Sequence, residues 1–563
     1  MHKVEKLGRV AGAAELYFHT LRHLKPVQFY GRALFRLARP RPDLSPPPPL
    51  GTRSAQWVVP ARRAPSLAGP GHFQFLNESG LLSETGWDDP RREKLWRYNQ
   101  HYFDDLNARD AQNRRDWHMA LIGEWIAANP PGQGTGWEPY PLSLRMVNWI
   151  KWALAGNELP PDAIESLAIQ ARWLTRRLEW HLLGNHLFAN AKALVFVGLY
   201  FAGDEASRWR DLGFRILAGE FREQILPDGG QFERSPMYHA LAIEDVLDLV
   251  NVCTCFASEL NTAQVGQVMH WRETAPSMLR WLEAMCHPDG EIAFFNDAAI
   301  GIAPDKAELK RYARQLGLKA TVRLEDIVWL RDSGYARLAR EPAVLIADVG
   351  PVGPDYLPGH AHADTLSFEF SLHGQRIIVN SGTSQYGSGA ERLRQRGTAA
   401  HSTLVLDGCD SSQVWSGFRV GRRARPFDVE VTETARALLL QAAHDGYTRL
   451  HGRPIHHREW QLAKGELKVR DTVSGVGGHR AEILFHLAPG LVPMQTDERT
   501  WQICSKATRG IHATVEFDAA DVKKIQSSWH PQFGLTLPSW ALSASLSGPC
   551  PLEHQTVFRW GDL

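Results

Sequence analysis

The chain is poor in cysteine, and its few cysteines follow no pattern. Six cysteines occur in 563 residues, with no Cys-x-x-Cys pair and no regular spacing. Zinc fingers and disulfide scaffolds depend on such spacing, so the sequence predicts neither. Cys253 and Cys255 lie within an apolar helical pattern, and we expect both thiols to belong to a hydrophobic core.

The chain also lacks an excess of charge of either sign. Its 63 Lys and Arg balance 62 Asp and Glu, which leaves a formal net charge of +1. This balance gives no overall attraction to a nucleic acid, so no nucleic-acid partner is expected. A local group of basic residues could still hold an acidic polymer.

Long hydrophobic runs are missing as well. No stretch has the length and apolar character of a membrane-spanning helix. Lys3, Lys6 and Arg9 precede a short apolar run at 10–14, but Glu15 interrupts it and no signal peptide is evident. We therefore expect no membrane span and a cytoplasmic location.

The chain changes from helical to extended patterns near residue 326. With 44% hydrophobic and 22% charged residues, a chain of this length can bury the cores of two or more domains. Apolar residues recur at helical spacing in four segments, 164–178, 204–226, 239–260 and 265–286. Residues 187–201 are apolar nearly all round, which predicts an inner helix. Short alternating runs typical of strands follow at 343–349, 427–432, 458–473 and 481–487.

These patterns divide the chain into three regions. Residues 1–50 are predicted as a basic helical segment that ends in a stiff proline-rich linker. Residues 51–325 are predicted as a helical domain, and residues 326–563 as a β-domain. Because helices come first and strands second, the expected fold class is α+β with separate domains, not a parallel α/β sheet.

Two histidines stand immediately before a predicted strand. Residues 359–364 are Gly-His-Ala-His-Ala-Asp, and the alternating run 365–372 that follows predicts a half-buried strand. On an extended backbone His360 and His362 point the same way. One can then face a substrate and the other a metal ion, or both can bind one ion. The alternative is a histidine pair that only stabilises a loop.

Two polar motifs interrupt the helical half. Asn185 and His186 lie in Gly-Asn-His-Leu-Phe-Ala-Asn at 184–190, just before the inner helix. At the positive end of a helix dipole they would suit a carboxylate, although a helix cap followed by a buried histidine is the alternative. Residues 226–239 join two helices and carry Glu, Arg, Ser and Tyr, which is too polar for a simple connector.

Together the motifs resemble one known family. A Gly-Thr turn with a tyrosine at 379–387 and Ala-His-Ser-Thr at 400–403 follow the two-histidine motif in order. This ordered set is similar to that of the heparinase II/III-like polysaccharide lyases. The similarity covers roughly residues 95–420, including the aromatic motifs at 96–103 and 137–145. It implies an incomplete (α/α) toroid followed by an antiparallel β-sandwich.

The resemblance also implies roles for individual residues. Asn185 and His186 would bind and neutralise a uronate carboxylate, and Tyr238 would be the catalytic tyrosine. His360 would face the substrate, and Tyr386 would lie near the scissile bond. The further substrate-binding candidates are Asn99, His101, Tyr140, Arg145, Glu233, Arg234 and Arg396. The three arginines among them are expected to line a cleft between the domains, with structural salt bridges as the alternative.

A metal site is implied by the same resemblance. His362, Asn380 and His401 align with the metal cluster of the family, which implies one divalent ion, Zn, Mn or Ca, in a structural role. Asn380 stands where the family usually has an acidic ligand. A neutral amide oxygen is a weaker donor than a carboxylate, so this position is the weakest of the three.

The reaction that the resemblance implies is β-elimination at a uronic acid. The substrate would be an acidic polysaccharide such as a glycosaminoglycan, alginate or a bacterial exopolysaccharide. Neutralising the carboxylate acidifies the proton on C5 by stabilising the enolate. Tyr238 would serve as acid, and Tyr386 or His360 as base. Family members often work in the periplasm or outside the cell, in contrast to the cytoplasmic location expected above.

The sequence is also compatible with two other functions. A glycoside hydrolase would need two carboxylic acids across the scissile bond, for which Glu233 and Asp297 are candidates. A non-catalytic protein of polysaccharide binding or exopolysaccharide assembly could share the fold.

The lyase hypothesis makes one structural demand, because Tyr238 and His360 come from different domains. Their side chains must lie within about 15 Å to act on one sugar.

Overall fold

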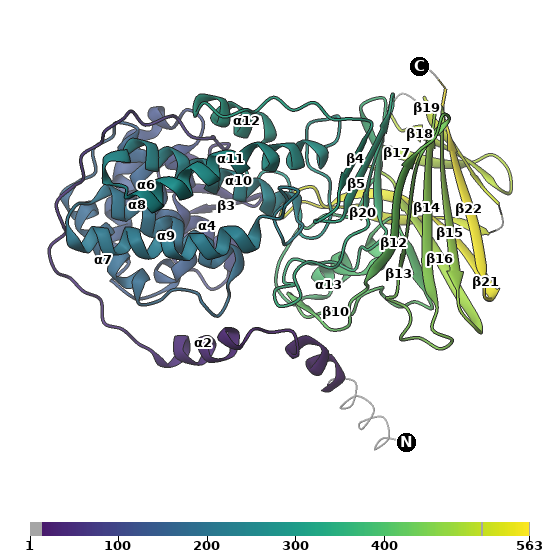
Figure 1. Ribbon diagram of the computed structural model, residues 1–563, viewed down its shortest axis with the longest axis horizontal. Coiled ribbons are helices and arrows are strands. Elements are labelled where there is room, and N and C mark those ends of the chain that lie inside the picture. The colour runs from purple at the N-terminus through teal and green to yellow at the C-terminus, as the bar shows by residue number, and fades with distance from the viewer. Residues whose placement is uncertain (1–13, 508–509, 519, 562–563) are drawn as a thin grey trace.

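The computed structural model describes residues 14–507, 510–518 and 520–561, which form a helical domain followed by a β-domain (Figure 1). The basic residues and most of the apolar run considered for a signal peptide fall at 1–13, outside the described residues. The last helix of the first domain ends at Gln315, and the first strand of the second begins at Ile327. The predicted α+β order, helices before strands, is confirmed.

The helical domain is a curved array of antiparallel helices, an incomplete (α/α) toroid. Its helices are α4 (Lys94–Tyr102), α5 (Arg115–Ala128), α6 (Pro139–Leu154), α7 (Pro161–Thr175), α8 (Gly184–Tyr200), α9 (Asp204–Gln224), α10 (Pro236–Cys255), α11 (Thr262–Ala284) and α12 (Lys306–Gln315). Each of the four segments with helical spacing is a helix, and Cys253 and Cys255 are buried as expected.

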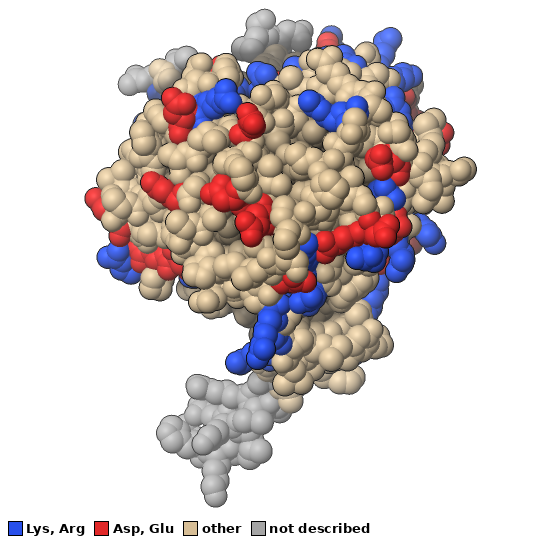
Figure 2. Space-filling view, turned by 90° about the vertical axis from the view of Figure 1, so that its left-hand side faces the viewer, with Lys and Arg blue, Asp and Glu red and all other residues tan. Residues whose placement is uncertain are grey.

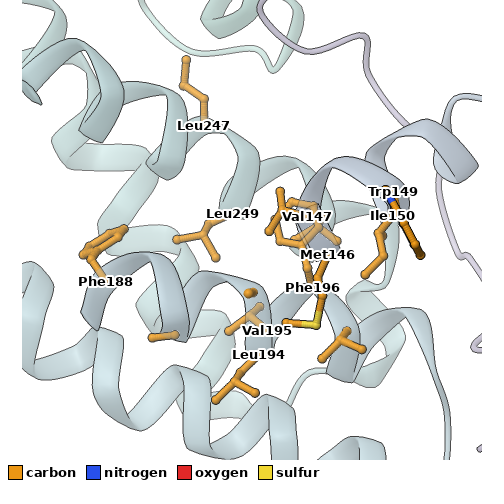
Figure 3. Close-up of a cluster of buried hydrophobic side chains, with 14 of the residues drawn as sticks. Met146, Val147, Trp149, Ile150, Phe188, Leu194, Val195, Phe196, Leu247 and Leu249 are labelled. Atoms are coloured by element: carbon orange, nitrogen blue, oxygen red, sulfur yellow. The ribbon is translucent and has the colours of Figure 1, made fainter. Parts of the chain in front are cut away.

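Helix α8 is the inner helix that the sequence predicts. All of its residues from 187 to 199 are buried, and it packs against α6, α7, α9 and α10. Figure 3 shows this core, with Phe188 and Phe196 of α8 beside side chains of α6 and α10. Full burial of one such side chain contributes about 1.5–3 kcal/mol, so this contact is a principal source of the domain's stability.

Smaller elements precede the toroid. Residues 14–21 and α2 (Pro26–Leu37) are helical, and an extended segment leads from α2 to the toroid. A three-stranded sheet of β1 (Leu67–Gly69), β2 (His72–Phe75) and β3 (Glu78–Leu81), followed by the short α3 (Leu82–Thr85), packs against α4. No described helix is long and apolar enough to cross a membrane.

Three large antiparallel sheets build most of the β-domain, beside a small two-stranded sheet of β10 (Val414–Trp415) and β11 (Arg419–Val420). The first holds β4 (Ile327–Leu330), β5 (Tyr335–Arg340), β6 (Ala343–Asp348), β7 (Phe368–Leu372) and β8 (Gln375–Ile378) in chain order. The other two have the strand orders β12-β13-β14-β15-β22-β19-β18-β17 and β20-β21-β16-β9. Their strands are β9 (Leu404–Leu406), β12 (Pro426–Glu433), β13 (Ala437–His444), β14 (Ile455–Ala463), β15 (Glu466–Ser474), β16 (Gly478–His486), β17 (Leu491–Gln495), β18 (Thr500–Ser505), β19 (Ile511–Phe517), β20 (Asp521–Trp529), β21 (Leu537–Pro549) and β22 (Leu552–Arg559).

The sheets pack as a sandwich that also contacts the toroid. One hydrophobic core joins residues of all three sheets, including Phe370, Trp460 and Phe485. The opposite face of the first sheet packs against the toroid, where Ile346 meets Trp281 of α11. The sequence segment 458–473 turns out to be the hairpin of β14 and β15, with Gly465 at a positive φ of 74° in its turn.

This layered packing corrects one expectation about the strand after the two histidines. Both faces of β7 are buried, so the prediction of a half-buried strand is wrong. Its polar face is inside because Glu369 accepts hydrogen bonds from the backbone of Phe294 and Asn380, and Ser371 bonds to His287. The strand therefore lies between the toroid and the sandwich core.

Candidate active site

Two tyrosines from different domains meet at the junction of the toroid and the β-domain. The hydroxyls of Tyr238, near the start of α10, and Tyr386, in the loop after β8, are 2.8 Å apart and share a hydrogen bond. The Ser235 hydroxyl caps α10 by accepting a hydrogen bond from the Tyr238 backbone N–H. Both tyrosine side chains are partly exposed, so a substrate can reach the pair.

His360 lies directly beside these tyrosines. Its ring is 3.9 Å from the ring of Tyr238, measured between centroids, which satisfies the distance that the lyase hypothesis demands. The Nδ1 atom of His360 is 3.0 Å from Asp297 Oδ2, and its Nε2 atom is 3.6 Å from Glu233 Oε2. The histidine is therefore held between two carboxylates, one at each ring nitrogen.

Asp297 is the centre of a buried network behind His360. Both of its carboxylate oxygens bind the guanidinium of Arg392, on α13 (Ala390–Arg396), and Oδ1 is 2.9 Å from His362 Nε2. Burial alone would raise the pKa of Asp297, but Arg392 and the two histidines hold that pKa well below its ordinary value. The carboxylate is thus a fixed negative charge that orients His360.

Asn185 and His186 lie in the first turn of α8, because this helix begins at Gly184, three residues earlier than the inner helix that the sequence predicts. Gly184 begins this helix with a positive φ of 56°, and a Cβ there would lie 2.3 Å from the Leu357 side chain. His186 Nδ1 is 3.2 Å from Glu179 Oε1, and its ring is 4.5 Å from that of Tyr140. Burial opposes charge on His186, but Glu179 raises its pKa overall. The site therefore offers an imidazole whose charged form Glu179 favours, at a helix N-terminus.

The tyrosines are held in their protonated form. Burial is the largest cause that raises the pKa of Tyr238 well above its ordinary value, and the neighbouring Tyr386 raises it further. Burial also raises the pKa of Tyr386, although the charge of Arg392 opposes that shift. At neutral pH each phenol is consequently a proton donor.

Two of the remaining substrate-binding candidates lie close to this group. Glu233 contacts His360 as described, and Tyr140 stacks on His186. Asn99 is on α4, half-buried, and its amide donates to the carbonyl of Leu95 in the same helix.

The other four candidates do not line the site. Arg145 is fully buried against the ring of Trp125, and His101 accepts a hydrogen bond from the same indole. Arg396 is also fully buried, bound to the carbonyls of Ala361, Ser416 and Arg419. Arg234 donates to the Ser333 carbonyl. The expectation that these arginines line a cleft is wrong, because carbonyl oxygens and aromatic rings hold them inside the protein.

A cluster that could hold a metal lies behind the site. His362, Asp364 and His401 each offer one ligand atom, and the three atoms lie within 4.8 Å of one another. The amide of Asn380, the third metal ligand that the sequence predicts, donates to Ser367 and accepts from the backbone of Ser402.

The donor set of this cluster fits a divalent ion. His362 Nδ1 faces His401 Nε2 at 3.1 Å, and burial keeps His401 neutral by lowering its pKa. Burial also raises the pKa of the Asp364 carboxyl, which a cation beside it would reverse. Two imidazoles and one carboxylate are ligands typical of zinc and related metals.

Sequence reasoning missed three members of the site. Arg392 lies in a short helix with no motif, and the sequence suggests Asp297 only as a carboxylic acid of a hydrolase. Asp364 directly follows the two-histidine motif, so its position two residues after His362 was a usable signal. Asn296 and Asp297 gave no such signal, because their loop is defined by contacts with residues distant in the sequence, including Arg392 and His362.

Comparison with solved structures defines the class of fold. The structure of heparinase III superposes with a TM-score of 0.65 at 18% identity, covering 83% of this chain and 76% of that one. The heparan sulfate lyase HepC of Pedobacter heparinus superposes with a TM-score of 0.56 at 19% identity, covering 87% and 81%. At this identity the likeness shows the fold, a toroid joined to a β-sandwich.

Comparison with family models then places the chain. The model "Heparinase II/III N-terminus" matches residues 90–317, and "Heparinase II/III-like, C-terminal" matches residues 322–553. The chain therefore belongs to the heparinase II/III-like family.

Sequence relatives agree with this placement. The chain is 26% identical over 334 residues to a heparin-sulfate lyase of Pedobacter heparinus, covering 53% of this chain and 49% of that protein. It is 24% identical over 276 residues to a heparin-sulfate lyase of Bacteroides stercoris, covering 44% and 40%. The chain thus spans about half the length of the curated relatives it matches.

Proposed function

We propose that this protein is a polysaccharide lyase that cleaves a uronic-acid-containing polysaccharide by β-elimination. The observation that carries the proposal is the meeting of Tyr238, Tyr386 and His360 across the domain junction. Membership of the family and the names of the relatives, heparin-sulfate lyases, support the same reaction.

The first task of the site is to neutralise the uronate carboxylate. His186 is suited to this because its raised pKa favours the imidazolium. Asn185 stands beside it at the helix N-terminus, with its amide unbonded to other described residues. Together they would stabilise the enolate that forms when the C5 proton leaves.

The second task is to move two protons. Asp297 accepts a hydrogen bond from His360 Nδ1, which leaves Nε2 as the acceptor. We assign Nε2 as the base for the C5 proton and the protonated Tyr238 as the acid for the leaving O4 oxygen. Tyr386 is hydrogen-bonded to Tyr238 and can return a proton to it after turnover.

The substrate we propose is an acidic polysaccharide of the glycosaminoglycan class. The relatives are named for heparin sulfate, and a carboxylated sugar fits His186, whose raised pKa favours the charged form. Alginate and bacterial exopolysaccharides present the same uronate chemistry and belong in the same screen.

The hydrolase alternative is disfavoured by the geometry of its two carboxylates. Glu233 and Asp297 approach opposite nitrogens of one histidine, so they do not flank an open space for a sugar. Asp297 is also fully buried and paired with Arg392, and it therefore cannot donate a proton to a leaving group.

We also propose that His362, Asp364 and His401 hold one structural divalent ion. Such an ion would supply positive charge beside the buried Asp364 carboxylate and would fix His362, which contacts Asp297. Chelation should then lower the melting temperature, and elemental analysis should find about one metal per chain. A protein without metal, whose melting temperature is unchanged by a chelator, would leave only a hydrogen-bonded histidine cluster.

The test of the proposed function is an ultraviolet assay. Elimination leaves an unsaturated uronate that absorbs in the ultraviolet, whereas hydrolysis does not. Heparan sulfate, hyaluronan, chondroitin, alginate and bacterial exopolysaccharides should be compared, and at least one should give rising absorbance. Binding without any absorbance change across these substrates would instead support the non-catalytic alternative.

A further inference from the structure

The N-terminal helices carry large apolar side chains on the surface of the protein. In α2, Leu37 is 79% exposed, Leu34 60% and Tyr30 57%. In the preceding helical segment 14–21, Phe18 is 63% exposed. Single exposed apolar residues need no explanation, but a contiguous group of them marks an interaction site.

Helix α2 is amphipathic, and its second apolar face points away from the protein. Gln28, Gly31 and Phe35, at i, i+3 and i+7 spacing, form the inward face. Tyr30, Leu34 and Leu37, at i, i+4 and i+7 spacing, lie on another side of the helix. Tyr30, Leu34 and Leu37 therefore do not pack against the rest of the protein as the inward face does.

The inward face fixes the helix to the rest of the molecule. Phe35 packs on His181 at 4.3 Å between ring centroids, and the guanidinium of Arg177 covers the same phenyl ring at 3.6 Å. Gln28 donates to the carbonyl of Tyr356 at 3.1 Å, four residues before His360. The outward face thus has a fixed orientation relative to the proposed active site.

The helical segment 14–21 is attached to the other domain. The Trp415 indole donates to the Thr20 hydroxyl, and Tyr17 packs edge-on against the same indole at 5.0 Å. The N-terminal helices therefore run along one side of both domains, at the lower edge of Figure 1.

Basic residues accompany the apolar face. Residues 1–42 contain nine of the 63 Lys and Arg but only two of the 62 Asp and Glu, so the remainder of the chain has an excess of acid. On α2, Arg32 and Arg36 are both exposed, at i, i+4 spacing in the same helix as the exposed apolar residues. Figure 2 shows Lys and Arg side chains gathered beside an uncharged surface at the lower end of the molecule.

We infer that residues 14–41 dock the protein on the surface of an anionic lipid bilayer. Leu, Phe and Tyr side chains enter the boundary of headgroups and acyl chains, while neighbouring arginines bind anionic headgroups. This inference does not rest on the proposed function, since it uses no residue of the active site.

Two other occupants fit the observations less well. A second copy of the chain would bring the same basic face against itself, because a two-fold interface pairs identical surfaces. An acidic polysaccharide would satisfy the arginines but would leave Leu34 and Leu37 without a suitable partner. A bilayer accounts for both the charge and the aliphatic side chains.

The test is co-sedimentation of the full chain with vesicles. Binding should occur to vesicles of equal parts phosphatidylcholine and phosphatidylglycerol, should be weak to pure phosphatidylcholine, and should fall as salt is added. Arg32→Gln with Arg36→Gln should weaken binding about fivefold per arginine removed. Leu34→Ser with Leu37→Ser should weaken it about tenfold or more.

Matched controls use exposed residues on the β-domain. Val476→Ser with Met494→Ser, and Arg436→Gln, change similar side chains far along the chain and should leave vesicle binding as in the wild type. All variants should keep the wild-type melting temperature, since every changed side chain is exposed.

Three results would overturn the inference. The first is wild-type protein that ignores anionic vesicles. The second is a dimer in light scattering that the leucine variant dissociates, which would identify a second copy as the occupant. The third is binding to soluble heparin that the arginine variant loses and the leucine variant keeps, without binding to vesicles, which would identify a polysaccharide.

Discussion

At the scale of single residues, the proposed proton donor is Tyr238, a phenol that burial has made a very weak acid. Tyr238→Phe removes one hydroxyl and leaves the ring packed on His360. Turnover should fall by about 10²–10⁴-fold, because the general acid is lost, while the melting temperature should stay near the wild-type value. The matched control is Tyr30→Phe on the exposed helix α2, which should be fully active. Near-normal turnover of well-folded Tyr238→Phe would remove this tyrosine from the mechanism.

Asp297 is predicted to act through His360 and also to stabilise the fold. Asp297→Asn leaves the buried Arg392 without its carboxylate, which should cost about 3–5 kcal/mol of stability. It should also change the pH profile of kcat/KM, because the amide no longer holds the His360 ring in one tautomer. Thr383→Val is the milder control, since it removes only a hydroxyl 3.2 Å from the same carboxylate. An unchanged pH profile in folded Asp297→Asn would contradict the positioning role.

The motif residues could be predicted from the sequence, and their buried supports could not. Asn185, His186, Tyr238 and His360 stand at helix starts or beside a strand, where local pattern identifies them. The prediction that Arg145 and Arg396 line a cleft failed because a sequence does not show whether an arginine binds a carboxylated ligand or a group inside the protein, such as a backbone carbonyl. Their partners, such as the Ala361 carbonyl, are set by tertiary packing.

At the scale of elements, a buried ionic cluster ties three helices of the toroid together. Asp248 of α10 accepts hydrogen bonds from Lys151 of α6 at 2.9 Å and Lys192 of α8 at 2.7 Å. Burial opposes its charge, but the two lysines lower the pKa of Asp248 to about 2. The pKa of Asp248 is lower in the folded protein than in the unfolded chain. The carboxylate therefore stabilises the fold at any pH above its pKa in the unfolded chain, and this stabilisation is lost as the pH falls toward 2.

Urea unfolding across this pH range checks the prediction. Wild-type protein should lose about 2 kcal/mol from this group between neutral pH and about pH 2. Asp248→Asn should be less stable at neutral pH, since it leaves buried lysines with fewer partners, and should lose less on acidification. Parallel pH dependence in the two proteins would show that Asp248 does not carry this contribution.

Helices and strands with a clear hydrophobic pattern could be predicted from the sequence. Elements whose burial depends on how the sheets and the toroid stack could not. The inner helix α8 is apolar all round and is buried as that pattern indicates. Strand β7 alternates and yet is buried on both faces, because the toroid covers the side that alternation assigns to solvent. The sequence predicts one extended run at 458–473, but this segment folds as a hairpin of two strands. Gly465 permits the turn between them because glycine readily adopts a positive φ.

At the scale of the whole molecule, the site exists only because two domains meet. The toroid supplies Asn185, His186 and Tyr238, and the β-domain supplies His360 and Tyr386. The order of the domains followed from the change of hydrophobic period, and the ordered motifs implied that both domains contribute. The five-stranded sheet between the toroid and the sandwich could not be predicted. Its two faces are buried by segments distant in the sequence, one by the sandwich core and the other by the toroid.

The central claim is cleavage by elimination, and the masses of the products test it most directly. A defined uronate-containing oligosaccharide from the class that gives ultraviolet absorbance should be cut once and both products weighed by mass spectrometry. Elimination adds no water across the broken bond, so we predict that the two masses add up to the mass of the substrate. Products whose masses together exceed that of the substrate by one water would show hydrolysis and contradict the account.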